Sequence, residues 1–307
     1  MKDSILINPD IEDALSNKKP VVTLESSFIA HGLPYPSNLE LVLEMLDIIE
    51  KHSVIPAVTA VINGKIRVGL EKSELEEMAK AGKDYFKAAA GDFGALLAKG
   101  AKGATTVAGT IFTAHLAGIK ICVTGGIGGV HRDVSHNFDI SQDLTVLSKY
   151  PVSVVSAGAK AILDISLTLE YLETIGVPIV GYRTKYFPSF YSRTSPYELD
   201  HTVESSGEAA KIIKYYERLG WQGGLLIATP LPDEESLSEE FIDSILEKAL
   251  TEAKRLTIRR KHLTPYLLNY LSENSGGKCL KANISLLKNN ARLAAEISLA
   301  YYQPTLD

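Results

Sequence analysis

Lys160 has the surroundings in this sequence that best suit covalent chemistry. It follows an apolar run, Val152–Val155, and a flexible segment of small residues at 156–159. We predict a helix over Ala159–Thr174, which places the amine at a helix N-terminus beside apolar side chains. The positive helix end and the loss of water both disfavour an ammonium ion, and imine formation requires a neutral amine. An exposed lysine on a first helical turn is the plainer interpretation, but the small residues leave room for a ligand.

Glu25 is the second candidate, because it ends a short apolar strand predicted over Pro20–Leu24. A carboxylate at the lip of a buried strand loses part of its water. This loss favours the protonated form and suits the group to proton transfer. A carboxylate that caps a neighbouring helix is an equally good interpretation of the same residue.

A run of glycines, Gly125–Gly129, follows another predicted strand, Ile119–Val123. Glycine lets the backbone approach a ligand closely and exposes its N–H groups. His131 stands where a dinucleotide fingerprint has its third glycine, and the Lys-Ser or Lys-Thr pair of a P-loop is missing. The run therefore indicates a substrate or phosphate contact only weakly, and a tight structural turn explains it nearly as well.

Histidines and aspartates crowd the stretch after the glycines. Carboxylate oxygens suit a hard divalent cation such as Mg²⁺ or Mn²⁺, which keeps several waters and needs few protein ligands. The spacing lacks the close histidine pair of a zinc-binding helix. From these residues alone a solvated polar loop is the slightly better interpretation. The residues concerned are His131, Asp133, His136, Asp139 and Asp143.

Composition narrows the class of protein. The chain has 307 residues, 45% of them hydrophobic, with 32 Lys and Arg against 37 Asp and Glu. The formal net charge of −5 includes no basic surplus, so nucleic acid is not an expected partner, whereas a small phosphorylated substrate is compatible. Two cysteines, Cys122 and Cys279, do not form a disulfide framework and fit a reducing compartment as small apolar residues.

Targeting signals are not apparent in the sequence. Residues 1–4 mix charge with polar groups and begin no signal-peptide core. The most apolar stretch, Val107–Val130, is interrupted by His115, Lys120 and several glycines, which argues against a membrane span. We therefore expect a cytoplasmic protein without a membrane partner.

The elements that would position these residues alternate between strand and helix. This order predicts an α/β fold, in which a mostly parallel central sheet is flanked by helices on both faces, in a single domain over 1–307. Asn63-Gly64 predicts a type I′ turn and an antiparallel hairpin within Ala57–Leu70. Ligands of such sheets bind at the carboxyl ends of the strands, so we expect the candidate residues to converge there.

The sequence also predicts several further helices and two further strands. Helices are predicted from capping boxes at Ser37–Glu40 and Ser73–Glu76, and over Val107–Ala117, Glu235–Lys254 and Ile284–Tyr302; strands are predicted over Ile179–Tyr182 and Leu225–Ala228.

At these residues the chain resembles the pseudouridine-5′-phosphate glycosidase family, also called pseudouridylate synthase and related to indigoidine synthase A like proteins. The matches run in order from about residue 20 to the C-terminal helix, almost the whole chain. The matching segments are Leu24–Ser26, His31–Pro36, Thr105–Ala108, Thr124–Arg132, Asp139–Leu144, Ala157–Lys160, Ile162–Asp164, Glu170–Thr174, Gly176–Pro178, Ala282–Ile284 and Lys288–Ala291.

The resemblance implies roles for matching positions. Lys160 would attack the anomeric carbon of the sugar, and Glu25 would act as the acid and base. Asp139 would hold one Mn²⁺ per subunit largely through water, although Mg²⁺ would also fit. Substrate contacts would come from Lys87 near the phosphate and from Val107, His131, Ser141, Gln142, Asp143 and Asn283. The family also implies a homotrimer.

The chain departs from the family pattern after Lys87. The family usually carries a serine and two arginines before Asp92, whereas this chain has three alanines and Gly91. A guanidinium pair offers charge-assisted, bidentate hydrogen bonds to phosphate that one lysine cannot replace. The departure bears on the phosphate affinity and on the identity of the substrate.

The resemblance implies reversible cleavage of the carbon–carbon glycosidic bond of pseudouridine 5′-phosphate, giving uracil and ribose 5-phosphate in pseudouridine catabolism. The enzyme would be a lyase with glycosidase activity that works through a Lys160–sugar iminium. A Schiff-base aldolase or lyase acting on another sugar phosphate would use the same lysine. A C-glycosynthase with another aromatic partner would also fit these residues, and so would a non-catalytic homologue.

Overall fold

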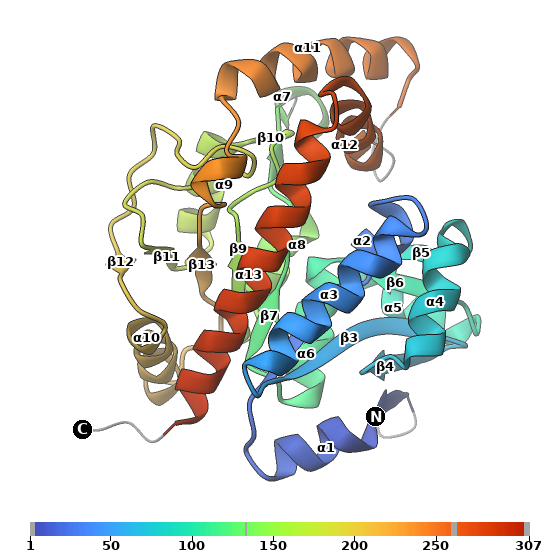
Figure 1. Ribbon diagram of the computed structural model, residues 1–307, viewed down its shortest axis with the longest axis vertical. Coiled ribbons are helices and arrows are strands. Elements are labelled where there is room, and N and C mark those ends of the chain that lie inside the picture. The colour runs from blue at the N-terminus through green and yellow to red at the C-terminus, as the bar shows by residue number, and fades with distance from the viewer. Residues whose placement is uncertain (1–3, 133, 259–262, 304–307) are drawn as a thin grey trace.

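The structure is a computed structural model that describes residues 4–132, 134–258 and 263–303 (Figure 1). In these ranges eleven strands form one mixed sheet with the order β1-β4-β3-β2-β7-β9-β13-β11-β12, and β5 and β6 extend it beside β3. A separate antiparallel pair joins β8 to β10. The strands are β1 (Ile5–Ile7), β2 (Val21–Leu24), β3 (Ile55–Ile62), β4 (Lys65–Val68), β5 (Phe86–Ala88), β6 (Gly103–Thr105), β7 (Ile121–Val123), β8 (Val130–His131), β9 (Ser153–Ser156), β10 (Leu163–Asp164), β11 (Ile179–Tyr182), β12 (Thr202–Val203) and β13 (Leu226–Ala228).

Helices cover both faces of the sheet, as the sequence predicts. Figure 1 shows α3 and α13 in front of the sheet and α6 behind it, with α11 and α12 together at the top near α7 and β10. The helices are α1 (Pro9–Ser16), α2 (Ser27–His31), α3 (Ser37–Lys51), α4 (Lys72–Lys80), α5 (Phe93–Ala98), α6 (Val107–Ala117), α7 (Val134–Asn137), α8 (Gln142–Leu147), α9 (Ile165–Thr174), α10 (Ser206–Arg218), α11 (Glu239–Arg255), α12 (Leu263–Asn274) and α13 (Lys278–Tyr302), with short 3-10 turns at Gly82–Asp84, Ala90–Asp92 and Asp233–Glu235.

The centre of the sheet is parallel and buried. Strands β2, β7, β9 and β13 are wholly buried and pair in parallel, with Thr23 opposite Cys122 and Ile121 opposite Ser153. Parallel strands covered by helices on both faces read as continuous apolar runs, which is why the sequence reveals them. Their carboxyl ends lie at one edge, where Glu25 follows β2 and Thr124 follows β7.

The predicted hairpin is confirmed. Strands β3 and β4 pair antiparallel, and Ile62 lies opposite Lys65. Asn63 and Gly64 have φ angles of 50° and 70°, the two positive values that a type I′ turn requires. A Cβ on Gly64 would approach the Leu97 carbonyl oxygen to 2.8 Å, so packing also favours glycine there.

The two helices predicted from serine capping boxes are present, but their predicted caps are wrong. Helix α3 begins at Ser37, but Pro36 stands at the N-cap and the buried Asn38 side chain bonds to the carbonyl oxygens of Ile29 and Ala79 at 2.7 and 2.9 Å. Helix α4 begins at Lys72, and the Glu71 amide donates to Glu74 Oε2 at 2.8 Å. The capping box of α4 therefore begins at Glu71, two residues before the predicted Ser73.

The C-terminal helices also differ from the prediction. Helix α11 starts at Glu239 after Ser238, whose hydroxyl caps the Phe241 amide at 3.2 Å. Helix α13 starts six residues before the predicted Ile284, and α12 has no counterpart in the prediction. Within the described ranges, none of the helices combines the length and apolar character needed to cross a lipid bilayer.

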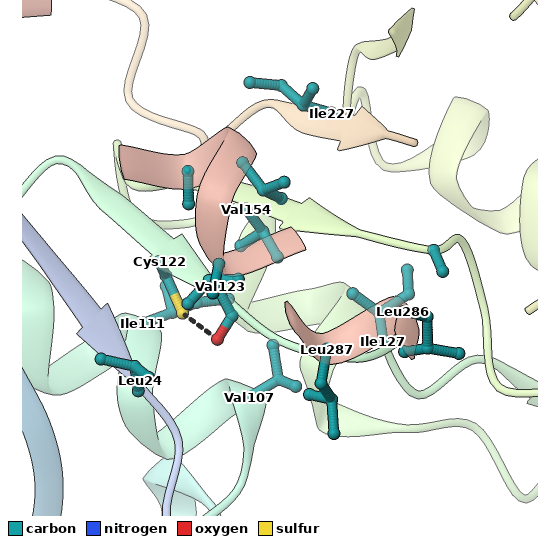
Figure 2. Packing of buried hydrophobic residues seen from close by; sticks show 14 of the residues in the cluster. Leu24, Val107, Ile111, Cys122, Val123, Ile127, Val154, Ile227, Leu286 and Leu287 are labelled. Carbon is teal, nitrogen blue, oxygen red and sulfur yellow. Dashed lines mark hydrogen bonds between the residues drawn. The ribbon is translucent and has the colours of Figure 1, made fainter. Parts of the chain in front are cut away.

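The core beneath the strand ends packs side chains of the sheet against α6 and α13. Figure 2 shows Val107 and Ile111 of α6 and Leu286 and Leu287 of α13 close to the apolar residues of the strands. Cys122 lies among them, and burial raises the pKa of its thiol well above the ordinary value. Both cysteines are free and buried, as predicted.

Candidate active site

Two cavities meet at the carboxyl ends of the parallel strands. The larger has a volume of about 800 Å³ and the smaller of about 120 Å³. Ser27, Lys87, Lys160 and Thr264 line both cavities, so these side chains form the boundary between them. Of the residues predicted from the sequence, the larger cavity is lined by Lys87, His131, Asp139, Ser141, Gln142, Asp143 and Lys160, and the smaller by Glu25, Lys87, Lys160 and Asn283.

The Glu25 carboxylate is enclosed by hydroxyl groups. Its side chain is only 4% exposed, and it follows β2 directly. Ser27 Oγ donates to Oε2, and Thr124 Oγ1 donates to Oε1. The buried amide of Asn290 in α13 donates to the carbonyl oxygens of Thr124 and Gly125 at 2.8 and 3.2 Å. Helix α13 thus fixes the loop that brings Thr124 to Glu25.

Lys160 lies in a loop, and its predicted place at a helix N-terminus is wrong. Helix α9 begins only at Ile165, after Asp164 accepts a hydrogen bond from the Leu167 amide at 3.0 Å. Gly158, with φ of 79°, turns the chain in a way that a helix cannot accommodate. The helix dipole therefore does not act on the Lys160 amine as the sequence suggested.

The glycine run holds the Lys160 loop in place. The Ile127 amide donates to the Gly158 carbonyl oxygen and the Lys160 amide donates to the Ile127 carbonyl oxygen, both at 3.0 Å. The Ala157 amide donates to the Gly125 carbonyl oxygen at 2.9 Å. The glycine run therefore supports the loop that carries the half-buried Lys160. This role agrees better with a tight structural turn than with a phosphate-binding loop.

Asp143 is bound on both carboxylate oxygens by main-chain amides. Ala108, in the first turn of α6, donates to Oδ1, and Gly128 donates to Oδ2, each at 2.8 Å. A Cβ on Gly128 would overlap Ser141, whose hydroxyl caps the Asp143 amide at 3.2 Å. Asp143 therefore joins α6, the glycine run and α8, in addition to lining the larger cavity.

Val107 belongs to the core beneath the cavities. Its side chain is fully buried in the core and lines neither cavity. In the first turn of α6 the next two amides donate to Asp143 and Thr106. The first turn of α6 therefore meets the larger cavity through its cap residue Thr106, which lines that cavity.

The predicted metal site has a single well-placed carboxylate. Asp139 lines the larger cavity, and its Oδ2 lies 4.0 Å from His131 Nε2. No group of three or more possible ligands occurs among the described residues; Asp133 and the side chain of His136 lie outside them. One carboxylate in a polar cavity fits a hard cation that keeps most of its waters, and it does not fit a closed structural site.

The proposed phosphate end combines Lys87 with backbone of the 88–92 segment. Lys87 lies in β5. The burial of His31 lowers the pKa of its imidazole, and the positive charge of Lys87 lowers it further. A hydrogen bond between His31 and the Tyr85 backbone opposes this shift. The Gly91 amide donates to Gln142 Oε1 at 3.3 Å. Gln142 therefore occupies the space in front of Gly91, one of the positions where the family pattern has an arginine.

Sequence reasoning missed several residues of the cavity walls. Ser27 and His31 line the cavities and follow Glu25 closely in the sequence, so their nearness to this candidate was an available signal. Thr264 and Lys254 come from α12 and α11, whose placement over the cavity no local pattern reveals.

Comparison with known proteins identifies the relatives of this chain. The family model for indigoidine synthase A like protein matches residues 10–300. Pseudouridine-5′-phosphate glycosidase of Caldanaerobacter subterraneus subsp. tengcongensis is 49% identical over 299 residues, covering 97% of each chain, and that of Petrotoga mobilis is 50% identical over 292 residues, covering 95% of each. The crystal structure of the prealnumycin C-glycosynthase AlnA in complex with ribulose 5-phosphate is 36% identical, with a TM-score of 0.89 over 97% of both chains.

Proposed function

The chain belongs to the indigoidine synthase A like family, and from that membership we propose that it is an enzyme that acts as a pseudouridine-5′-phosphate glycosidase. It cleaves the carbon–carbon bond between uracil and ribose 5-phosphate, and the reaction is reversible. The observation that carries the proposal is the position of Lys160 on the boundary of two cavities, with Glu25 on the wall of the smaller one.

The reaction needs a covalent step because a uracil carbon is a poor leaving group. With the ribose ring opened, the Lys160 amine bonds to the anomeric carbon, and Glu25 moves the protons. Protonation of the uracil carbon lets the carbon–carbon bond break while the lysine nitrogen becomes an iminium. Water then releases ribose 5-phosphate and restores the amine. The covalent intermediate divides one difficult displacement into easier steps.

The remaining residues bind and orient the substrate. Lys87 faces the phosphate, while Ser141, Gln142 and Asn283 supply hydrogen bonds, and His131 completes the wall near Asp139. One Mn²⁺ or Mg²⁺ per subunit, held by Asp139 through its waters, would supply positive charge in the larger cavity. Asp143 holds the glycine run in place.

The wider setting of the enzyme is also part of the proposal. We propose that residues 1–307 act as a single domain, that the protein assembles as a homotrimer, and that it serves pseudouridine catabolism in the cytoplasm. Sedimentation of the purified protein tests the trimer, because a monomer or dimer at working concentrations contradicts it.

Turnover and trapping test the proposed function together. Purified protein is incubated with pseudouridine 5′-phosphate and Mn²⁺, and uracil and ribose 5-phosphate are measured. Borohydride added with ribose 5-phosphate reduces the iminium, and mass mapping identifies the modified residue. We expect a pentose-phosphate adduct on Lys160, and no turnover in Lys160→Ala.

The exposed Lys149, outside both cavities, gives the matched control, because Lys149→Ala should keep full activity. Release of a triose phosphate would identify an aldolase instead, and a fully active Lys160→Ala would refute the covalent mechanism.

A second candidate function is C-glycosidic bond formation with a different aromatic partner. The structural likeness to the C-glycosynthase AlnA favours it, and so does the alanine and glycine segment after Lys87, which alters the phosphate end. Offering ribose 5-phosphate with a panel of aromatic bases tests it. Faster product formation with another base than with uracil supports this candidate.

A further inference from the structure

The two hydroxyl groups that donate to Glu25 differ in what else they contact. Thr124 is 1% exposed and lines neither cavity. Its hydroxyl has one further acceptor, the Gly126 carbonyl oxygen at 3.5 Å, and its own carbonyl oxygen is held by Asn290. Ser27 is half-buried, begins α2 and lines both cavities.

Glu25 itself reaches only one of the two cavities. It lines the smaller cavity, whereas the larger one contains Asp139, Gln142 and the rest of the polar wall. Each carboxylate oxygen is already covered by a hydroxyl. Ser27, Lys87, Lys160 and Thr264 line both cavities, and the hydroxyl of Ser27 donates directly to Glu25. A proton on a group in the larger cavity therefore has a direct path to Glu25 through this hydroxyl.

We propose that Ser27 is a further catalytic residue, which relays protons between Glu25 and a substrate hydroxyl in the larger cavity. This inference rests on the proposed function. The substrate O–H bond breaks and its proton bonds to Ser27 Oγ, while the proton of Ser27 passes to Glu25 Oε2. The electron pair stays on the substrate oxygen, and the serine ends with one proton, as it began.

A hydroxyl suits this task because it donates and accepts at the same time. The relay runs backwards when Glu25 returns the proton. Thr124 keeps the other carboxylate oxygen in place during both steps, and it can turn its own proton to the Gly126 carbonyl oxygen when Glu25 is protonated. Thr124 is accordingly a positioning residue, because it contacts neither cavity.

Single-turnover kinetics in mixtures of H₂O and D₂O test the relay. Two protons that move in one step give a curved dependence of rate on the deuterium fraction, whereas one proton gives a straight line. We expect a curved plot for the wild-type enzyme and for Ser27→Thr, which retains a hydroxyl. Ser27→Ala should lose about 100-fold in kcat, the lower end of the range for proton-transfer groups, with little change in KM and a straight plot.

Two further variants separate the relay from a structural role. Thr124→Val removes the other hydroxyl and should keep the curved plot even if its rate falls. Ser148→Ala, outside both cavities, should leave rate and curvature unchanged. If Ser27→Ala does not fold, as judged by circular dichroism, Ser27→Cys tests the same point with a weaker donor of similar size.

The outcomes distinguish the relay from the proposed function. A Ser27→Ala or Ser27→Cys enzyme with kcat within threefold of wild type, or with an unchanged curved plot, overturns the relay while uracil release stands. A wild-type enzyme that releases no uracil contradicts the proposed function, and the relay with it.

Discussion

The site contains two regions built around buried carboxylates that share nearly the same exposure. Glu25 is 4% exposed and Asp143 is 5% exposed, and each accepts two hydrogen bonds. The donors to Glu25 are side-chain hydroxyls, whereas the donors to Asp143 are main-chain amides. A hydroxyl can turn and accept a proton, but an amide N–H cannot. The hydrogen bonds to Glu25 can therefore reverse direction, whereas those to Asp143 cannot.

The difference shows that burial alone does not identify a catalytic acid. The Asp143 region joins three segments, since the carboxylate binds the first turn of α6 and the glycine run and itself begins α8. A negative charge at the N-terminus of α6 also suits the helix dipole. The Glu25 region joins the ends of β2 and β7 to the start of α2 and opens onto the smaller cavity. We therefore propose that the first region stabilises the fold and that the second performs the chemistry.

The largest effect is expected at Glu25. Glu25→Gln keeps the shape but cannot take up a proton, so kcat should fall by about 10²- to 10⁴-fold, the range for general acid and base groups. KM should change little, and thermal unfolding should stay close to that of wild type. Steady-state release of uracil measures the effect. If Glu25→Gln turned over as fast as the wild type, Glu25 would not be the acid and base of the reaction.

Asp143→Asn should act on stability. The amide group of asparagine places a donor against one of the two main-chain amides, which leaves buried donors without an acceptor and costs about 2 to 3 kcal/mol. Urea unfolding measures this loss. Asp164→Asn is the matched control, because asparagine caps a helix as well as aspartate does and α9 should be unaffected. Equal losses in the two variants would contradict the structural role of Asp143.

Lys87 gives a smaller effect that is specific to the phosphate. Lys87→Gln removes the positive charge at that end of the cavity, and we expect KM for pseudouridine 5′-phosphate to rise about tenfold, which corresponds to roughly 1.4 kcal/mol. KM for pseudouridine without the phosphate should stay the same. A rise for both substrates would place Lys87 elsewhere in the mechanism, and this comparison also measures the consequence of the missing arginines.

The smallest effect is a pH dependence of stability from His31. Burial and the charge of Lys87 hold the pKa of this imidazole below its usual value of 6.5. As the pH falls through 6.5, the unfolded chain binds a proton before the folded protein does, so the contribution of His31 to stability declines until its folded pKa is reached. Its Nε2 is buried and has no partner among the described residues.

Urea unfolding of wild type and His31→Gln between about pH 8 and pH 5.5 measures this dependence. The free energy of unfolding of the wild type, relative to that of the variant, should decrease as the pH falls. A constant or growing difference on acidification would show that the imidazole binds its proton as readily in the folded protein as in the unfolded chain.

The elements that were predicted correctly are those whose caps, turns or apolar runs lie within a few residues of one another. The bounds of α6 match the prediction, since Thr106 caps its start and Gly118, with φ of 80°, ends it. The Asn63-Gly64 turn and the buried strand before Glu25 are equally local. Such features depend on residues a few positions apart, and the sequence presents them directly.

The loop before α9 was predicted wrongly because its conformation depends on distant residues. Apolar spacing continues from Ala159 into α9, and only the hydrogen bonds to 125–127 show that Lys160 precedes the helix. The roles of Val107 and Asp143 were uncertain for the same reason. Sequence cannot show that one side chain is buried in the core and that the other is bound to amides 15 and 35 residues away.

The sequence by itself determined the alternating α/β order, the hairpin, the family and the residue types available for chemistry. These follow from apolar periodicity, turn preferences and ordered matches along the chain. Only the tertiary structure decided which carboxylate meets hydroxyls and which meets amides, and that Lys160 and Ser27 stand between two cavities. Hydrogen-bond partners depend on how strands and helices pack across the sheet, and packing brings together residues that no local pattern connects.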